Sequence, residues 1–143
     1  MRFELPASKK LVHEMTMPIR WGDMDAMGHV NNTIYFRYFE IARLDWFFRI
    51  AAPHGITLQS SEGVVIVNAF CNFVRQLEYP GDVRTRMYVG GEVGRSSFDT
   101  YLTMERTDEP GVVYAEGGAT TVWTDFAAKK SRPMPEWLRA IVG

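Results

Sequence analysis

The sequence has a single cysteine, Cys71, so one chain cannot form an internal disulfide. Disulfides are typical of secreted proteins, and residues 1–10 show no signal-peptide pattern. Together these observations predict a cytoplasmic protein. No apolar run approaches the roughly 18 residues that a transmembrane helix requires, so no membrane association is expected.

The chain also lacks a large net charge and any residue spacing that is typical of metal ligands. The chain has 16 Lys and Arg against 17 Asp and Glu, for a formal net charge of −1. Without a basic field, binding to nucleic acid or to an anionic membrane is not predicted. The three histidines are scattered and show no ligand spacing, so no metal site is predicted. No other cofactor is implied.

No internal repeat, low-complexity segment or linker divides the 143 residues, which predicts a single domain over 1–143. Apolar residues make up 46% and charged residues 23%, as in an ordinary globular protein. The four Trp, nine Phe and six Tyr are numerous for this length. Such aromatic content indicates a well-filled core, an apolar pocket or a subunit interface.

One long helix is predicted directly after Asn31 and Asn32, either of which can cap it. Pro53 and Gly55 are expected to end it. Its apolar arc is so wide that we expect other elements to cover the helix on most sides. The arc consists of Tyr35, Phe39, Ala42, Trp46 and Ile50, widened by Ile34, Tyr38 and Ile41.

Alternation of period two predicts five strands, at residues 13–20, 62–77, 83–89, 98–105 and 112–125. Gly117 and Gly118 interrupt the last of these and predict a bulge or a sharp bend. Short connections predict that the last four strands form an antiparallel meander. A short helix is expected at 136–142. A twisted sheet that wraps the long helix gives an α+β fold.

Groups capable of chemistry gather in residues 20–33, just before the long helix. Asp23, Asp25, His29 and two Asn side chains fall within ten residues. A helix N-terminus has unpaired N–H groups and a partial positive charge, which can hold an anion or a developing oxyanion. A carboxylate on a loop that curls back could attack a carbonyl polarised there, or activate water. The alternative is ordinary loop and capping chemistry, which is more common for an isolated Asp-x-Asp.

Other catalytic patterns are absent. No serine stands in a nucleophile-elbow motif, and the glycines at 90, 91 and 94 lie between strands, where they indicate a turn and not a phosphate loop. Lys129, Lys130 and Arg132 could pair with the phosphates of a nucleotide-bearing substrate, or form a solvated loop.

The run Gly22-Asp23-Met24-Asp25-Ala26-Met27-Gly28-His29-Val30-Asn31-Asn32, followed by Tyr35, Tyr38 and Phe39-Glu40, resembles the signature of the 4-hydroxybenzoyl-CoA thioesterase family. The order of elements over essentially the whole chain is similar too. The resemblance implies the hotdog fold, an antiparallel five-stranded sheet wrapped around a long central helix. It also implies an acyl-CoA thioesterase that works as a homodimer or homotetramer, with active sites between subunits.

The resemblance also assigns roles to residues. Asp25 matches the catalytic aspartate, which acts as nucleophile or as general base. The backbone N–H of Asn32 matches the group that polarises the thioester carbonyl. Relatives have a tyrosine or a histidine at the position of Asn32, so the side chain differs here. The backbone N–H donor is retained. His29 aligns with a catalytic histidine of plant acyl-carrier-protein thioesterases, whose catalytic asparagine falls on Met27, a residue unable to replace it.

Substrate contacts are expected from Asn31 and Tyr35. The acyl chain is expected in an apolar slot at the subunit interface, lined by the central helix and the strand face of Asn68 and Asn72. The basic residues at 129, 130 and 132 are expected at the CoA phosphates. A hotdog hydratase or dehydratase, a non-catalytic acyl-CoA-binding module and a structural dimer are the alternatives. The sequence identifies neither the acyl group nor the thiol carrier.

Overall fold

The computed structural model describes all 143 residues. The strands are β1 (Lys10–Pro18), β2 (Glu62–Phe73), β3 (Asp82–Val89), β4 (Ser97–Arg106), β5 (Val113–Asp125) and the short β6 (Lys130–Ser131). The helices are α1 (Asn32–Ala51) and α2 (Glu136–Val142), with 3-10 turns η1 (Trp21–Asp23) and η2 (Ala52–His54) before and after α1. Neither helix is both long enough and apolar enough to span a bilayer.

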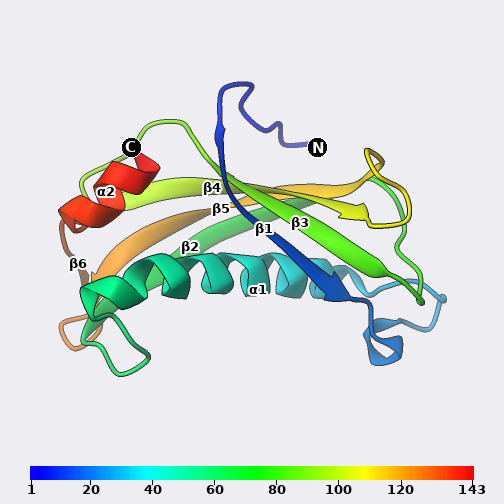
Figure 1. Cartoon of the computed structure of the whole chain (residues 1–143), viewed down its shortest axis with the longest axis horizontal. Coiled ribbons are helices and arrows are strands. Elements are labelled where there is room, and N and C mark those ends of the chain that lie inside the picture. Colours follow the sequence, from blue (N-terminus) through cyan, green and yellow to red (C-terminus); the bar gives the residue numbers. More distant parts are fainter.

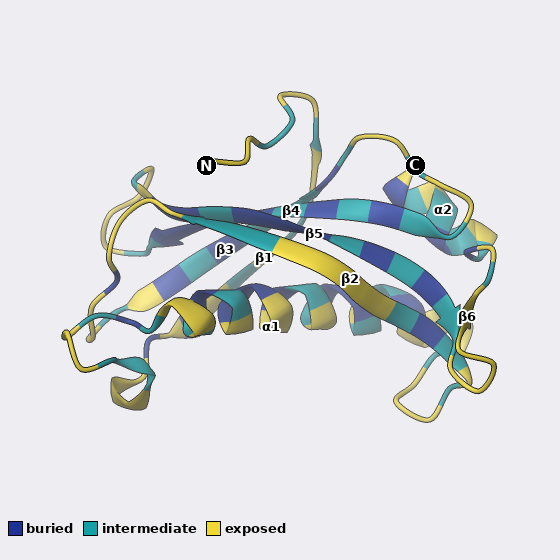
Figure 2. Cartoon of the chain, turned by 180° about the vertical axis from the view of Figure 1, so that it is seen from behind, coloured by how far each residue is buried: buried dark blue, intermediate teal, exposed yellow.

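Five strands form one sheet in the order β1-β3-β4-β5-β2, with every neighbouring pair antiparallel, and β6 pairs with β5. The sheet curls over α1, which lies along its concave side (Figures 1 and 2). Helix and sheet share a core of 23 buried residues. The predicted α+β architecture, a hotdog fold, is confirmed.

The boundaries of α1 follow its sequence signals. The Asn31 side chain accepts a hydrogen bond from the Thr33 N–H at 2.9 Å, so Asn31 is the N-cap and Asn32 the first helical residue. After Ala51 the chain continues into η2, which Gly55 closes with a φ of 79°. As predicted, the sheet covers much of the apolar arc. Seven helix residues are buried: Tyr35, Tyr38, Phe39, Ala42, Trp46, Phe47 and Ala51.

Gly117 and Gly118 do not form the predicted bulge. They pair in regular register with Cys71 and Phe70 of β2. A Cβ atom at Gly117 would lie 2.5 Å from the Phe70 carbonyl oxygen and 2.9 Å from the Phe39 ring. The glycine is therefore needed for the close approach of α1 and β2 to β5, and not for a bend in the strand.

The predicted meander is correct for β3, β4 and β5 but wrong for β2. This strand pairs with β5 at the far edge of the sheet, and no hairpin joins it to β3. Residues 74–81 instead carry the chain past the start of β5, where the N–H groups of Val74 and Arg75 both donate to the Tyr114 carbonyl oxygen at 3.0 Å. Alternation defines the faces of a strand but not its neighbours.

β2 ends at Phe73, earlier than predicted, and contains the bulge that the sequence placed elsewhere. Its register shifts between Ile66 and Asn68, so Val67 is an extra residue. Because the bulge changes the phase of alternation, Val64 before it and Cys71 after it both pack against the core. The predicted division of β2 into two faces is therefore wrong before the bulge.

Asn72 faces away from α1, so within one chain Asn72 and the helix do not line a common slot. Its Oδ1 accepts a hydrogen bond from the Phe3 N–H at 3.2 Å. The Phe3 ring also lies 5.0 Å from the Phe70 ring, centroid to centroid. The N-terminal segment thus crosses the outer side of the sheet (Figure 1) before β1, which begins at Lys10, earlier than predicted.

Glu105 on β4 is the most buried carboxylate in the sheet, with 6% of its surface exposed. It accepts hydrogen bonds from the Gly111 N–H at 2.8 Å and from Arg84 at 3.1 Å, and pairs with Arg86 at 2.9 Å. Burial raises the pKa of the Glu105 carboxyl, but these three interactions outweigh it and hold the pKa below its usual value.

We expect Glu105→Gln to lower the free energy of unfolding at pH 7 by about 1–3 kcal/mol, because the Gly111 N–H and the two arginines lose a charged acceptor. The pKa of Glu105 is lower in the folded than in the unfolded protein, so its ionised form stabilises the fold fully above pH ~4.3, the unfolded-state pKa. This stabilisation is lost as the pH falls through the folded-state pKa. The difference between variant and wild type should therefore shrink in acid. Urea unfolding at pH 7 and at lower pH measures it.

Glu14→Gln is the matched control, because the exposed Glu14 pairs with Arg86 alone, at 2.6 Å. Exposed ion pairs contribute about 0–1 kcal/mol. A loss for Glu105→Gln that stays constant with pH would contradict a role for its ionised form.

Candidate active site

The loop before α1 is shaped by its own backbone. Met24 and Val30 form an isolated antiparallel bridge, and the Asp25 N–H donates to the His29 carbonyl oxygen at 2.7 Å. Gly28 turns the chain with a φ of 82°, a conformation that other residues rarely adopt. The Val30 N–H donates to the Leu77 carbonyl oxygen at 2.8 Å. These bonds fix the loop against the segment that follows β2.

The two aspartates of the loop have different environments. The Oδ2 atom of Asp23 accepts a hydrogen bond from the Tyr38 hydroxyl at 2.8 Å, and burial together with this bond raises the pKa of Tyr38. Asp23 thus ties the loop to α1. The Oδ1 atom of Asp25 accepts hydrogen bonds from the N–H groups of Met27 at 2.9 Å and His29 at 3.3 Å, whereas its Oδ2 atom bonds to no group of the chain.

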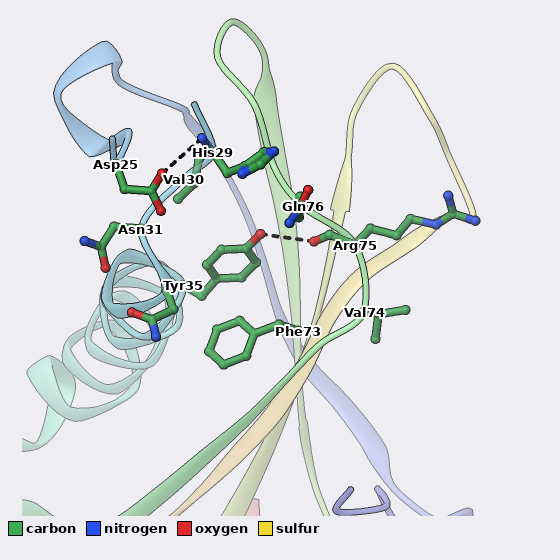
Figure 3. A pocket seen from close by; sticks show the side chains of 10 residues that line it. Asp25, His29, Val30, Asn31, Tyr35, Phe73, Val74, Arg75 and Gln76 are labelled. Atoms are coloured by element: carbon green, nitrogen blue, oxygen red, sulfur yellow. Dashed lines mark hydrogen bonds between the residues drawn. The ribbon is translucent and has the colours of Figure 1, made fainter. Parts of the chain in front are cut away.

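Asp25 lies at a cavity of about 620 Å³ between the N-terminus of α1 and the end of β2 (Figure 3). The structure brings five of the predicted site residues together here: Asp25, His29, Asn31, Asn32 and Tyr35. As the first helical residue, Asn32 has no intrahelical acceptor for its N–H, and no other backbone group accepts from it. Asp25 and Asn32, the helix residue with a free N–H, therefore line one cavity.

Tyr35 contributes its ring to the cavity wall and uses its hydroxyl for support. The hydroxyl donates to the Arg75 carbonyl oxygen at 3.0 Å and accepts from the Leu77 N–H at 2.9 Å (Figure 3). Burial raises the pKa of this phenol. His29 is half-buried, and its Nε2 atom lies 3.7 Å from a Glu78 carboxylate oxygen.

Besides Val30, four residues that line the cavity were not predicted as site residues: Phe73, Val74, Arg75 and Gln76. Their alternation made residues 62–77 resemble one continuous strand. Tyr79-Pro80-Gly81 is the only nearby signal of a change in direction, and it does not indicate that the chain turns toward the helix N-terminus. Among them, Arg75 is exposed, and its guanidinium extends away from Asp25 (Figure 3).

Cys71 does not line this cavity. Burial raises the pKa of the Cys71 thiol to about 12, so it is not a thiolate at neutral pH. No group of three or more His, Cys, Asp and Glu side chains could hold a metal ion.

Residues 19–142 match the family model of the Thioesterase-like superfamily. The chain belongs to this superfamily. No curated protein matches it by sequence.

Solved structures of related proteins extend this result. A proposed thioesterase of Pseudomonas aeruginosa is 34% identical over 94% of this chain and 100% of its own, with a TM-score of 0.84. A proposed acyl-CoA thioesterase of Xanthomonas campestris is 29% identical over 87% and 100%, with a TM-score of 0.75. A DHNA-CoA thioesterase of Staphylococcus aureus, 18% identical over 90% and 87%, shares the fold with a TM-score of 0.76.

The remaining predicted residues of this thioesterase-like chain lie elsewhere. Lys129, Lys130 and Arg132 are in or beside the turn between β5 and β6, at the end of the molecule where α1 finishes (Figure 1). Arg132 pairs with Asp125 at 3.3 Å. Within one chain these three residues and Asp25 therefore do not share a cavity, and their role at CoA phosphates stays a prediction.

Proposed function

We propose that the protein is an acyl-CoA thioesterase of the 4-hydroxybenzoyl-CoA thioesterase type, which hydrolyses an acyl-CoA to the free acid and CoA. The observation that carries this proposal is the shared cavity of Asp25 and the Asn32 N–H. One group can attack or activate a nucleophile, and the other can stabilise the oxyanion that results. The membership of the superfamily and the neighbouring thioesterase structures support the same chemistry.

In the proposed reaction, the thioester carbonyl oxygen accepts a hydrogen bond from the Asn32 N–H. The partial positive charge at the N-terminus of α1 stabilises the negative charge that develops on this oxygen. The Oδ2 atom of Asp25 faces no competing donor in the chain, while two backbone N–H groups hold Oδ1. The carboxylate is thus positioned without side-chain partners.

Two routes lead from this arrangement to products. As general base, Asp25 takes a proton from water, the hydroxide adds to the carbonyl carbon, and the C–S bond breaks as the thiolate of CoA leaves. As nucleophile, Asp25 forms a mixed anhydride with release of the same thiolate, and water then hydrolyses the anhydride. Both routes give one carboxylic acid and one thiol.

Thiol release across a panel of aromatic, short-chain, medium-chain and long-chain acyl-CoA substrates tests the function. Turnover of at least one class supports hydrolysis and identifies the acyl group. Hydration of crotonyl-CoA without thiol release would instead indicate a hydratase. Binding of acyl-CoA without either reaction would indicate a non-catalytic binding module.

We propose further that the protein forms a homodimer through the free edge of β2. This strand pairs only with β5, and no charged residue interrupts it from Gly63 to Phe73. The side chains of Val65, Ile66 and Val67 are exposed. A long, uncharged and apolar edge strand is a template for pairing with a second chain.

A two-fold dimer would pair the two β2 strands antiparallel, so that the start of one lies beside the end of the other. The start of β2 is paired with the end of β5, since Glu62 lies opposite Asp125. The basic turn at Lys129 and Lys130 of a second copy would thereby approach the cavity of the first. This geometry supports the predicted contact with CoA phosphates, alongside Arg75.

We expect Val67→Lys to convert the dimer to monomers at micromolar concentration, because the bulged Val67 is 58% exposed on this edge and a charge there opposes pairing. Sedimentation velocity measures the mass. Ile41→Lys is the control and should leave the dimer intact. Ile41 is exposed on the side of α1 that lies near β1 and away from β2. A wild-type monomer, or a Val67→Lys dimer, would contradict the β2 interface.

A further inference from the structure

A second cavity, of about 100 Å³, lies along α1 at a distance from the Asp25 site. The C-terminal half of α1 forms one side, the first part of β2 another, and β4 and β5 form the floor. Its walls are mainly apolar, with Phe47 and Ile66 among them. It shares no lining residue with the cavity at Asp25.

Thr100 on the floor of this cavity has an unpaired hydroxyl. The residue is 1% exposed, and its Oγ1 atom is buried without a hydrogen-bond partner, the single such side-chain atom in the chain. Thr85 on the neighbouring strand is equally buried, yet its hydroxyl donates to the Met15 carbonyl oxygen at 3.2 Å. Buried polar groups almost always have a hydrogen-bond partner, so a ligand or a water molecule is expected to bind this hydroxyl.

Arg43 lines the same cavity and is also without a partner. Its guanidinium is half-buried, and it takes part in none of the hydrogen bonds or ion pairs of the chain. Burial lowers its pKa. Glu40 lines the cavity too; its carboxylate lies 3.6 Å from Arg37, and its charge acts on Arg43 without a direct ion pair. Arg84 and Arg86, by contrast, both bond to Glu105.

Arg43, which has no direct ion pair, and Thr100, whose hydroxyl has no acceptor, therefore line the same small and mainly apolar cavity. A guanidinium and a hydroxyl match a carboxylate, which only accepts hydrogen bonds. The cavity, of about 100 Å³, is large enough for such a group. A ligand bound there by its carboxylate would extend outward between α1 and β2.

The two cavities lie along the same side of the helix. Asn32 and Tyr35 of α1 and Phe73 of β2 line the first, whereas Arg43 of α1 and Ile66 of β2 line the second. Eleven residues separate Asn32 from Arg43, which corresponds to roughly 16 Å along the helix axis at ~1.5 Å per residue. An extended carbon chain advances about 1.3 Å per bond, so roughly twelve bonds span this distance.

We propose that the second cavity binds a terminal carboxylate of the acyl group, and that the substrates are CoA thioesters of dicarboxylic acids. This inference rests on the proposed thioesterase function. Arg43 pairs with the distal carboxylate and Thr100 donates a hydrogen bond to it, while the thioester lies at Asp25. Arg43 and Thr100 are specificity residues and take no part in the bond-breaking step.

The test compares matched substrates: ω-carboxyacyl-CoA thioesters of about eight to fourteen carbons and their ω-methyl esters. Wild type is expected to favour the acid over the ester in kcat/KM. Arg43→Gln should lower kcat/KM for the acid by roughly 10–100-fold, mainly through KM, and leave the ester unchanged. Thr100→Val should give a smaller loss in the same direction, and Thr85→Val serves as the buried-threonine control.

Equal losses for acid and ester in Arg43→Gln, or no preference in wild type, would overturn the proposal. A change of oligomeric state in Arg43→Gln would do so as well, because Arg43 would then pair with a group of a second chain. If no acyl-CoA is hydrolysed, calorimetry with a free dicarboxylic acid of the same length tests the carboxylate site at Arg43 independently of the thioesterase function. Binding that Arg43→Gln abolishes would support the carboxylate site even though the thioesterase function had failed, and absence of binding would refute the site.

Discussion

Asp25→Asn is expected to lower kcat for thioester hydrolysis by about 10³-fold, within the range of ~10²–10⁴ for positioned acid–base groups. The amide keeps the size and an acceptor oxygen for the N–H groups of Met27 and His29, so the loop should retain its shape. It can neither take a proton from water nor attack a carbonyl. Thiol release with the best substrate of the acyl-CoA panel measures the loss, and circular dichroism verifies the fold.

Asp23→Asn is the matched control for this prediction. Asp23 lies two residues earlier on the same loop, but its carboxylate accepts the Tyr38 hydroxyl and does not line the cavity. We expect Asp23→Asn to retain most of the activity, with a modest loss of stability from the weaker hydrogen bond. Activity that survives in Asp25→Asn, or that falls equally in both variants, would remove Asp25 from the proposed mechanism.

The difference between these aspartates illustrates how much the sequence could reveal. The motif brought both carboxylates, His29 and the helix N-terminus into one candidate site. Which carboxylate is free depends on Tyr38, fifteen residues away in sequence, whose hydroxyl reaches Asp23 because α1 packs beside the loop. The resemblance favoured Asp25, but the residues alone left the choice open.

Local features of the fold were predicted well because they depend on neighbouring residues. The cap at Asn31 and the left-handed Gly55 set the limits of α1 and η2, and alternation located the strands. Strand order depends on contacts between distant segments, which alternation does not encode. For the same reason Arg75 could not be predicted as a site residue. It lines the cavity because β2 lies at the sheet edge and residues 74–81 return past the helix N-terminus.

Gly117→Ala is expected to lower the free energy of unfolding by about 3 kcal/mol or more, at the upper end of the range for overpacked sites. The new Cβ would stand 2.5 Å from the Phe70 carbonyl oxygen and 2.9 Å from the Phe39 ring. Urea unfolding followed by tryptophan fluorescence measures the change. Gly63→Ala in β2 is the control, because there the nearest atom, at 2.9 Å, belongs to the Phe126 side chain, which is exposed and free to rotate.

The two obstacles at Gly117 can be separated by shortening the movable one. Phe39→Leu removes the ring atoms near the new methyl group, whereas the Phe70 carbonyl belongs to the backbone of β2 and is fixed by its pairing with β5. We therefore expect the double variant Gly117→Ala/Phe39→Leu to recover less than half of the loss, measured against Phe39→Leu alone. Full recovery would show that helix packing alone requires the glycine. Little recovery would mean that the close approach of β2 to β5 requires Gly117. The position of β2, the proposed dimer edge, would then depend on a glycine at residue 117 of the neighbouring strand.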